Sequence, residues 1–328
     1  PQIIFEALTQ RKMKISIPES DGVIAEGLPL RRENALKVSV PIMYGCNNFC
    51  TYCIVPYVRG RERSRDTEDI LREVRAAIDG GAREILLLGQ NVNSYGKELG
   101  TNFSELLRRI NDIEGEFRVC YMSSHPKDAT EELIDTIAEC EKVTRHFHLP
   151  VQSGSSRILE LMNRRYTRER YLELTRYIRE KIPDAALTSD IIVGFPGETY
   201  EDFKETLSLI REVRFDSLYT FIYSPRKGTK AAEMPDPVSA EEKGKWFREL
   251  LEVQQEVGEN AYRGYIGRVM RVLCEGVGRT RDGCLTGKTR QNVIVDFDGD
   301  RELIGQFVNV EITGALNWAL LGKLAADG

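Results

Sequence analysis

The most informative part of the chain is an apolar segment with the cysteine-rich loop that follows it: Val38-Ser39-Val40-Pro41-Ile42-Met43-Tyr44-Gly45-Cys46-Asn47-Asn48-Phe49-Cys50-Thr51-Tyr52-Cys53. Residues 38–43 are predicted to form a buried strand, so the three thiols follow its carboxyl end, where α/β barrels place their chemistry. A structural zinc site normally closes with four ligands, whereas a [4Fe–4S] cluster on three thiolates keeps one iron open. The spacing therefore predicts an open cluster on Cys46, Cys50 and Cys53. A zinc knuckle or three unrelated core cysteines is the alternative.

This CxxxCxxC run is the signature of the radical S-adenosylmethionine (SAM) enzymes, and the chain resembles that superfamily at its most diagnostic motif. The other four cysteines are isolated in spacing: Cys120, Cys140, Cys274 and Cys284. Free cysteine is among the most buried residue types, so each is expected in a core. A disulfide between Cys274 and Cys284 would conflict with the reducing compartment that a labile cluster needs.

Length and charge are typical of an intracellular enzyme. The 328 residues suit a large α/β unit with an appendage. The net charge of −5 argues against a generally basic nucleic-acid coat and leaves local basic patches. No apolar run is long enough to span a membrane and no signal peptide is recognisable. We therefore expect a cytoplasmic protein with no membrane partner, and a monomer.

Buried strands and helices alternate along most of the chain. Strands are predicted near 38–43, 84–89, 118–123, 146–151, 187–193 and 217–223, and helices lie between them, as at 67–78, 133–140, 170–181 and 200–213. Six such units imply a parallel sheet with right-handed crossovers. The fold class is therefore α/β, an open (β/α)6 partial barrel.

A second, all-β module follows the boundary at 234–237. Ser239 and Glu242 form a capping box for a long helix that ends near 262–264, and strand-like segments follow at 269–273, 292–297 and 308–312. Residues 263–290 carry seven basic and two acidic side chains, whereas 291–328 carry two and six. The predicted small barrel thus has a basic side that suits a phosphate backbone.

Polar residues follow nearly every predicted strand, at the rim where ligands bind in such sheets. Each one alone is more often a turn residue. As SAM contacts we expect Gln90 for the methionyl ammonium, Ser123 and Gln152 for ribose or carboxylate, Arg164 for the carboxylate, and Asp190 and Tyr223 around the adenine.

Longer motifs narrow the resemblance. The cysteine loop with its continuation through 54–65, together with 148–155, 162–164 and 190–199, is similar to the methylthiotransferase family of radical SAM enzymes, nearest to its tRNA-modifying branch. The last module resembles a TRAM domain, an RNA-binding barrel, with Thr286-Gly287-Lys288-Thr289-Arg290-Gln291-Asn292 in the expected place. Candidate RNA contacts are Arg59, Arg61, Arg63, Arg279, Arg281, Lys288 and Arg290. The arginines near the cysteines have a solvated loop as their alternative.

The resemblance implies methylthio transfer to C2 of an isopentenylated adenosine beside the anticodon. One SAM methylates a sulfur of an auxiliary cluster, and a second is cleaved reductively to give the radical that activates the C2–H bond. The implied partners are a tRNA anticodon stem-loop and an electron donor such as flavodoxin or ferredoxin. The implied division is a linker at 1–36, a radical SAM domain at 37–258 and a TRAM domain at 259–328.

One departure from the family concerns the auxiliary [4Fe–4S] cluster. Family members hold it with three cysteines of an N-terminal domain, yet the first cysteine here is Cys46. We therefore expect the auxiliary cluster on a domain missing from this sequence, and SAM cleavage without methylthiolation of RNA by these residues alone. Three other functions stay open: a methylthiotransferase for threonylcarbamoyladenosine, one for a ribosomal-protein aspartate, or a non-catalytic RNA-binding protein with a structural metal site.

Overall fold

The computed structural model describes residues 2–10, 24, 36–278, 280–281 and 283–325. Most of the predicted linker at 1–36, and the candidate Arg279, therefore lie outside the described residues. Helix α1 (Gln2–Gln10) precedes the main body of the structure. No helix in the described part of the chain is long and apolar enough to cross a membrane.

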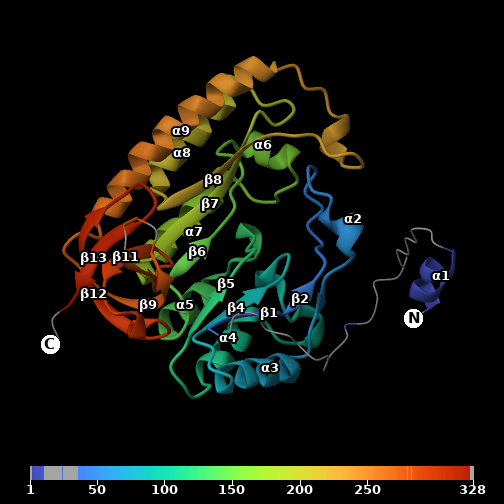
Figure 1. The fold of residues 1–328 in the computed structure, drawn as a ribbon. Coiled ribbons are helices and arrows are strands. Elements are labelled where there is room, and N and C mark those ends of the chain that lie inside the picture. The colour runs from blue at the N-terminus through green and yellow to red at the C-terminus, as the bar shows by residue number, and fades with distance from the viewer. Residues whose placement is uncertain (1, 11–23, 25–35, 279, 282, 326–328) are drawn as a thin grey trace.

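Six parallel strands form the wall of the larger domain (Figure 1). They occupy two three-stranded sheets: β1 (Lys37–Pro41), β4 (Glu84–Leu88) and β5 (Arg118–Tyr121), then β6 (His146–His148), β7 (Ala186–Val193) and β8 (Ser217–Ile222). A parallel bridge between Val119 and Val143 joins β5 to the segment before β6. The strands follow one another in chain order, which confirms the predicted open (β/α)6 barrel.

Helices cover the outer face of this wall. They are α3 (Thr67–Asp79), α4 (Phe103–Asn111), α5 (Glu131–Glu139), α7 (Arg168–Lys181), α8 (Tyr200–Val213) and α9 (Ala240–Arg263). Each begins at an Asp, Asn, Thr or Ser side chain that accepts a backbone N–H of the first turn. Alternate strand residues such as Val40, Leu87 and Ile191 are buried against the helices. Their neighbours in the strands therefore face the inside of the barrel.

Several short elements were not predicted. They are β2 (Met43–Tyr44), α2 (Val55–Arg59), β3 (Arg63–Ser64), α6 (Ser156–Leu161) and the 3-10 turns Val92–Ser94, Lys97–Leu99, Pro126–Asp128, Lys230–Glu233 and Arg301–Leu303. The strand predicted over 146–151 ends at His148. Pro150 has no N–H to offer the sheet, and the next amide, of Val151, donates to the Ser189 hydroxyl instead of to a strand carbonyl.

The last part of the chain is a closed barrel of five strands in the order β10-β11-β13-β12-β9, which confirms the predicted all-β module. The strands are β9 (Val269–Val277), β10 (Leu285–Thr289), β11 (Ile294–Asp298), β12 (Phe307–Ala315) and β13 (Leu320–Leu324). Val272, Val295, Phe297 and Val310 fill its interior. Cys274 and Cys284 are buried free thiols. Helix α9 runs unbroken across the predicted boundary at 258/259, and the division into domains stays a prediction.

The small barrel docks against the amino ends of the parallel strands. At the start of β5, Arg118 pairs with Glu84 of β4 and with Glu275 of β9, and it donates to the carbonyl of Lys288. At the start of β6, His146 meets Asn292. Just before β8, Asp216 accepts the Tyr265 hydroxyl at 3.0 Å. The barrel therefore lies at the opposite end of the strands from the cysteine loop (Figure 1).

Candidate active site

The cysteine loop is held at the carboxyl rim by backbone contacts. The Cys46 N–H donates to the carbonyl of Gly60 at 3.2 Å, and the Cys53 N–H closes a turn onto Cys50 at 2.9 Å. Gly45 has a positive φ, and a Cβ there would lie 1.9 Å from the Arg61 carbonyl oxygen, so only glycine fits. The Asn163 amide donates to the carbonyls of Asn48 and Phe49. The loop is thus fixed from both sides, with Cys50 buried and the other two thiols half-buried.

Three thiols on one loop are the ligand set of a [4Fe–4S] cluster with one open iron, and this role of the three cysteines stays a prediction. Burial raises the pKa of the Cys46 and Cys53 thiols, so binding iron as thiolates would release their protons.

Arg164, the predicted partner of the SAM carboxylate, lies beside Cys50. Its side chain is buried, and its guanidinium donates to the Cys50 sulfur at 3.4 Å, to the Pro150 carbonyl at 2.6 Å and to the Tyr166 hydroxyl at 3.0 Å. Burial alone would lower the pKa of Arg164, but these neighbours raise it well above its usual value. Arg164 therefore brings a permanent positive charge to the thiol that would carry a cluster, which strengthens the fit.

Gln90 also has a partner of its own. Its side-chain oxygen accepts the N–H of Gly45, immediately before the first cysteine. The residue therefore supports the cluster loop. Because an amide oxygen has a second lone pair, its contact with the SAM ammonium stays a prediction. The Lys127 ammonium supports the same loop, through Asn48 at 2.7 Å. Asn163 lies in a motif that the sequence singled out, whereas Lys127 carried no signal because its contact spans 79 positions.

Strained backbone gathers at this rim. Non-glycine residues with positive φ include Phe49 (49°), Ser123 (69°), Gln152 (73°) and Asn163 (58°). Such conformations cost about 1–3 kcal/mol each and persist where the surroundings over-determine them, often at ligand sites. Gln152 is held on both sides, because its N–H donates to Asp190 and its carbonyl accepts from Ile192, each at 2.9 Å. The predicted SAM contacts Ser123 and Gln152 thus share the rim with the cysteines.

The other two predicted SAM contacts are Asp190, within β7, and Tyr223, directly after β8. Tyr223 packs edge-on against Phe195, and its hydroxyl is buried with no hydrogen-bond partner among the described residues. Such an orphaned donor suits a bound ligand. Asp190 faces the inside of the barrel, where His148 lies 3.4 Å away. Burial raises the pKa of Asp190, although His148 opposes the shift.

The basic residues fall into two groups. Arg59 and Arg61 are exposed beside the cysteine loop, and Arg61 lies over the Phe49 ring at 4.6 Å. Arg63 is half-buried in β3. Arg281 in the small barrel pairs with Asp298 at 3.0 Å.

Arg290 and Lys288 lie where the two domains meet. Arg290 donates to the carbonyls of Cys140 and Val143, and burial lowers its pKa. Lys288 donates to Asn292, whose side chain meets His146. The Arg290 guanidinium thus joins the barrel to the larger domain, and its contact with RNA stays a prediction.

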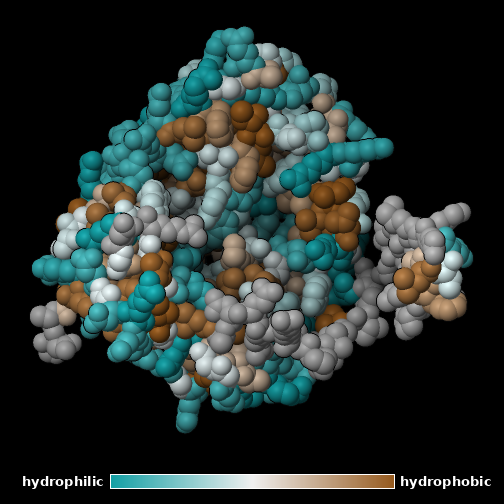
Figure 2. All heavy atoms as spheres, in the orientation of Figure 1, coloured by the Kyte–Doolittle hydropathy of each residue, from teal (hydrophilic) through white to brown (hydrophobic). Residues whose placement is uncertain are grey.

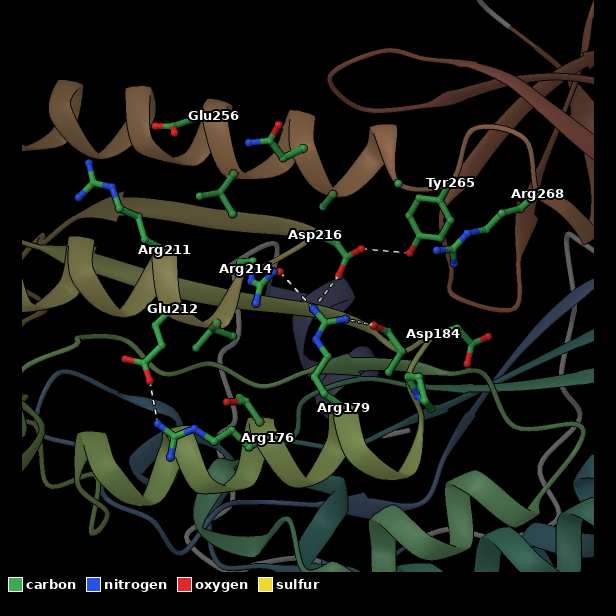
Figure 3. A pocket seen from close by; sticks show the side chains of 18 residues that line it. Arg176, Arg179, Asp184, Arg211, Glu212, Arg214, Asp216, Glu256, Tyr265 and Arg268 are labelled. Carbon is green, nitrogen blue, oxygen red and sulfur yellow. Dashed lines mark hydrogen bonds and ion pairs between the residues drawn. The ribbon is translucent and has the colours of Figure 1, made fainter.

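A cavity of about 840 Å³ lies away from the cysteines, among α7, α8, α9 and the small barrel (Figure 3). Arginines line it, but Arg176 pairs with Glu212 at 2.8 Å and Arg179 donates to the carbonyls of Ala185 and Arg214. Asp216 and Tyr265 close its end near the small barrel (Figure 3). This cavity is therefore a seam between helices, remote from the cysteine rim.

The turn after β7 contains a carboxyl group with an unusual environment. Glu198 is buried and accepts the N–H groups of Gly194 and Phe195. Burial raises the pKa of this carboxyl from 4.5 to about 7, more than the two hydrogen bonds lower it. The fold therefore favours the protonated acid. This contribution to stability is complete below pH 4.5 and is lost as the pH rises through about 7.

Glu198→Gln is expected to remove this pH dependence, because glutamine imitates the protonated acid. Between pH 5 and pH 8 the unfolding free energy of the wild type should fall by about 2.5 kcal/mol relative to the variant. Urea unfolding at both pH values measures this difference. Glu205→Gln, an exposed change on the neighbouring helix, should behave like the wild type. The same change of unfolding free energy with pH in the wild type and in Glu198→Gln would contradict the raised pKa of Glu198.

Comparison with known proteins agrees with this site. Residues 40–210 match the Radical SAM superfamily model, and residues 263–325 match the TRAM domain model. In fold the chain is similar to coproporphyrinogen III oxidase (HemN) from Escherichia coli, with a TM-score of 0.51 at 18% identity over 78% of this chain and 66% of that one. The radical SAM methyltransferase TsrM from Kitasatospora setae gives a TM-score of 0.50 at 19% identity over 59% of this chain and 35% of that one. The fold and the three-cysteine loop are thus those of a radical SAM enzyme.

Closer relatives are proteins named tRNA-2-methylthio-N(6)-dimethylallyladenosine synthase. The one from Acetivibrio thermocellus is 51% identical over 99% of this chain and 68% of its own length. The one from Alkaliphilus oremlandii is 49% identical over the whole of this chain and 70% of its own length. The chain belongs to the radical SAM methylthiotransferase family. This confirms the resemblance on which the expected [4Fe–4S] cluster and SAM rest.

Proposed function

We propose that the protein is a radical SAM tRNA methylthiotransferase, which adds a methylthio group to C2 of an isopentenylated adenosine beside the anticodon. The observation that carries the proposal is the three-thiol loop of Cys46, Cys50 and Cys53, fixed at the open rim of the barrel in a chain that ends in a TRAM module. The relatives at about half identity carry the name of this activity.

The chain's own residues hold and orient the reactants. Cys46, Cys50 and Cys53 would bind the cluster, and the Arg164 guanidinium would offset the negative charge on its sulfur ligands. When bound, the cluster supplies the electron that cleaves SAM and so provides the radical chemistry that a strong C–H bond requires. Ser123, Gln152 and Tyr223 are the residues we propose for SAM, since they lie on the same rim and no described residue hydrogen-bonds the Tyr223 hydroxyl.

The finer parts of the proposal concern partners. The anticodon stem-loop would meet Arg59, Arg61 and Arg63 near the cysteines and Arg281 on the small barrel. A low-potential protein such as flavodoxin or ferredoxin would supply electrons to a monomeric enzyme. The cytoplasm, where tRNA is found, would be its compartment. We propose an auxiliary [4Fe–4S] cluster on a further domain as the sulfur donor, since Cys120, Cys140, Cys274 and Cys284 are buried in the cores described here.

Anaerobic reconstitution tests the proposal. The chain is loaded with iron and sulfide and mixed with dithionite and SAM, and 5′-deoxyadenosine is followed by chromatography. Binding of an anticodon stem-loop is measured in parallel by fluorescence anisotropy. We expect both SAM cleavage and RNA binding. Binding of RNA by a loaded protein that cannot cleave SAM would instead support a non-catalytic RNA-binding protein, and cleavage without RNA binding would favour a protein substrate.

A further inference from the structure

The inner face of β6, β7 and β8 carries a row of side chains that the helices do not cover. On β7, Ile191 and Val193 are buried beneath the helices, so Asp190 and Ile192 face inward. The strand register places Tyr219 of β8 beside Asp190, and Phe221 beside Ile192. An edge-on contact of 5.6 Å between the rings of His148 and Tyr219 confirms that β6 and β8 share this face.

Large apolar side chains on this inner face are exposed. Tyr219 is 57% exposed and Phe221 52%, whereas Leu218, which faces the helices, is 6% exposed. On the other sheet, Tyr121 packs outward on Phe103, so the next residue, Met122, faces inward and is 49% exposed. Figure 2 shows a hollow at the centre of this face of the molecule, with hydrophobic atoms on both sides of it. Exposed aromatic surface inside a hollow is typical of a ligand site.

Polar side chains surround the Asp190 carboxylate in this hollow. The His148 Nε2 lies 3.4 Å from one Asp190 oxygen, and the His148 Nδ1 is hydrogen-bonded to the Thr188 hydroxyl at 3.0 Å. The same hydroxyl meets the His146 Nε2 at 2.9 Å, and the His146 Nδ1 lies 3.4 Å from the Asn292 amide. Burial lowers the pKa of both histidines and favours their neutral forms. The Gln152 side chain also donates to Asp190 and lowers the pKa of its carboxyl group. A carboxylate offers about four lone-pair sites, so Asp190 can still accept a hydrogen bond from a ligand.

The aromatic row starts next to the cysteine loop. The ring of Tyr52, between Cys50 and Cys53, lies 6.4 Å from that of Phe195, and Phe195 lies 5.5 Å from Tyr223. Tyr223 follows β8, two residues beyond Phe221. A planar group bound on Tyr219 and Phe221 would therefore lie just inside the rim that holds the thiols.

We propose that Tyr219, Phe221 and Asp190 form the pocket that reads the modified adenine, an inference that rests on the proposed function. The base stacks on Tyr219, its N6–H donates to Asp190, and its isopentenyl group packs on Phe221 with Met122 opposite. Enzymes that act on a flipped-out base read it in this way, by stacking and by hydrogen bonds to its edge. Asp190 then contacts the RNA base, and SAM is bound by Ser123, Gln152 and Tyr223 at the rim.

The same pocket disfavours threonylcarbamoyladenosine. That base carries a carboxylate on its N6 substituent, which would lie against apolar Phe221 and close to the Asp190 carboxylate. Burying a charge without a partner and beside a like charge is unfavourable on both counts. An isopentenyl group is uncharged and wholly apolar, and each buried CH₂ contributes about 0.8 kcal/mol. The pocket chemistry therefore separates the two modified adenosines.

Binding of three stem-loops by the reconstituted chain tests the pocket, with isopentenyladenosine, adenosine or threonylcarbamoyladenosine at the target position. The wild type should prefer the isopentenyl RNA about tenfold or more over each of the others. Phe221→Ala and the polar Phe221→Gln should reduce the preference over adenosine to about threefold or less, whereas Phe221→Leu should keep most of it. Tyr219→Ala should weaken all three RNAs by about tenfold. Tyr200→Ala, an exposed tyrosine of the outer layer, is the matched control and should change neither property.

The outcomes separate the pocket from the function. A wild type that cleaves SAM and binds RNA, but shows no preference for the isopentenyl base, overturns the pocket alone. An unchanged preference in both Phe221→Ala and Phe221→Gln, with thermal unfolding like that of the wild type, overturns it as well. A wild type that holds its cluster but neither cleaves SAM nor binds any stem-loop overturns the proposed function instead.

Discussion

Cys50→Ala is expected to abolish SAM cleavage while the chain stays folded. Two thiolates cannot hold a cluster that needs three, and even the loss of an outer partner of a metal site costs ten- to a hundredfold. The rate of 5′-deoxyadenosine formation should therefore fall by at least about a hundredfold. Truncating a buried cysteine to alanine removes one atom, so the unfolding free energy should fall by only about 1 kcal/mol.

Iron and sulfide content, with chromatography of 5′-deoxyadenosine, measures the effect. Cys140→Ala is the matched control, because Cys140 is also buried but lies outside the cysteine loop. That variant should keep both its cluster and its cleavage rate. SAM cleavage at an undiminished rate in Cys50→Ala would show that these thiols are not the cluster ligands.

Arg118→Ala is expected to cause the largest loss of stability. The Arg118 guanidinium is buried between Glu84 and Glu275, at 2.5 and 2.7 Å, and it also donates to carbonyls of β10. Burial tends to raise the pKa of Glu84, but Arg118 and Lys37 lower it below its usual value. Removing the cation breaks the buried ion pair of Glu84, while Glu275 keeps Lys37 as a partner. Breaking a buried pair in this way costs about 3–5 kcal/mol.

Urea unfolding followed by tryptophan fluorescence and circular dichroism measures this loss. The two domains share the Arg118 network, so the variant should also show the small barrel separating from the larger domain at lower urea. Arg75→Ala, an exposed change on α3, should alter the unfolding free energy by less than about 0.5 kcal/mol. A single transition with wild-type midpoint in Arg118→Ala would mean that the interface does not depend on this arginine.

The fold followed from local sequence patterns. Apolar strands such as 187–193 and helices such as 200–213 have clear periodicity and capping residues, and both occur where they were predicted. The short elements were missed because their form depends on contacts far along the chain. Residues 63–64, for example, form a strand only because Met43 and Tyr44 pair with them.

Site residues that are close together in the sequence could be predicted from their spacing, whereas the contacts between distant residues could not. The three cysteines lie on one loop, so their spacing alone placed them together. Arg164 and Gln90 lie beside the cysteine loop, but their partners, Cys50 and Gly45, are 114 and 45 positions away and could not be read from the chain. Arg290 carries a charge typical of RNA binding, yet its guanidinium donates to two carbonyls of the larger domain. Tyr219 and Phe221 gave no signal, because an aromatic residue in a strand is normally buried.

Because the small barrel docks at the amino ends of the strands, the distance between the barrel and the cysteine loop is fixed. The reactive rim and the barrel are separated by the length of the strands between them, and β7 with its 8 residues spans about 26 Å. An RNA that contacts the barrel and offers a base to the rim must bridge that length. The geometry would then select a nucleotide by its distance from the gripped part of the stem, before any contact with the base itself.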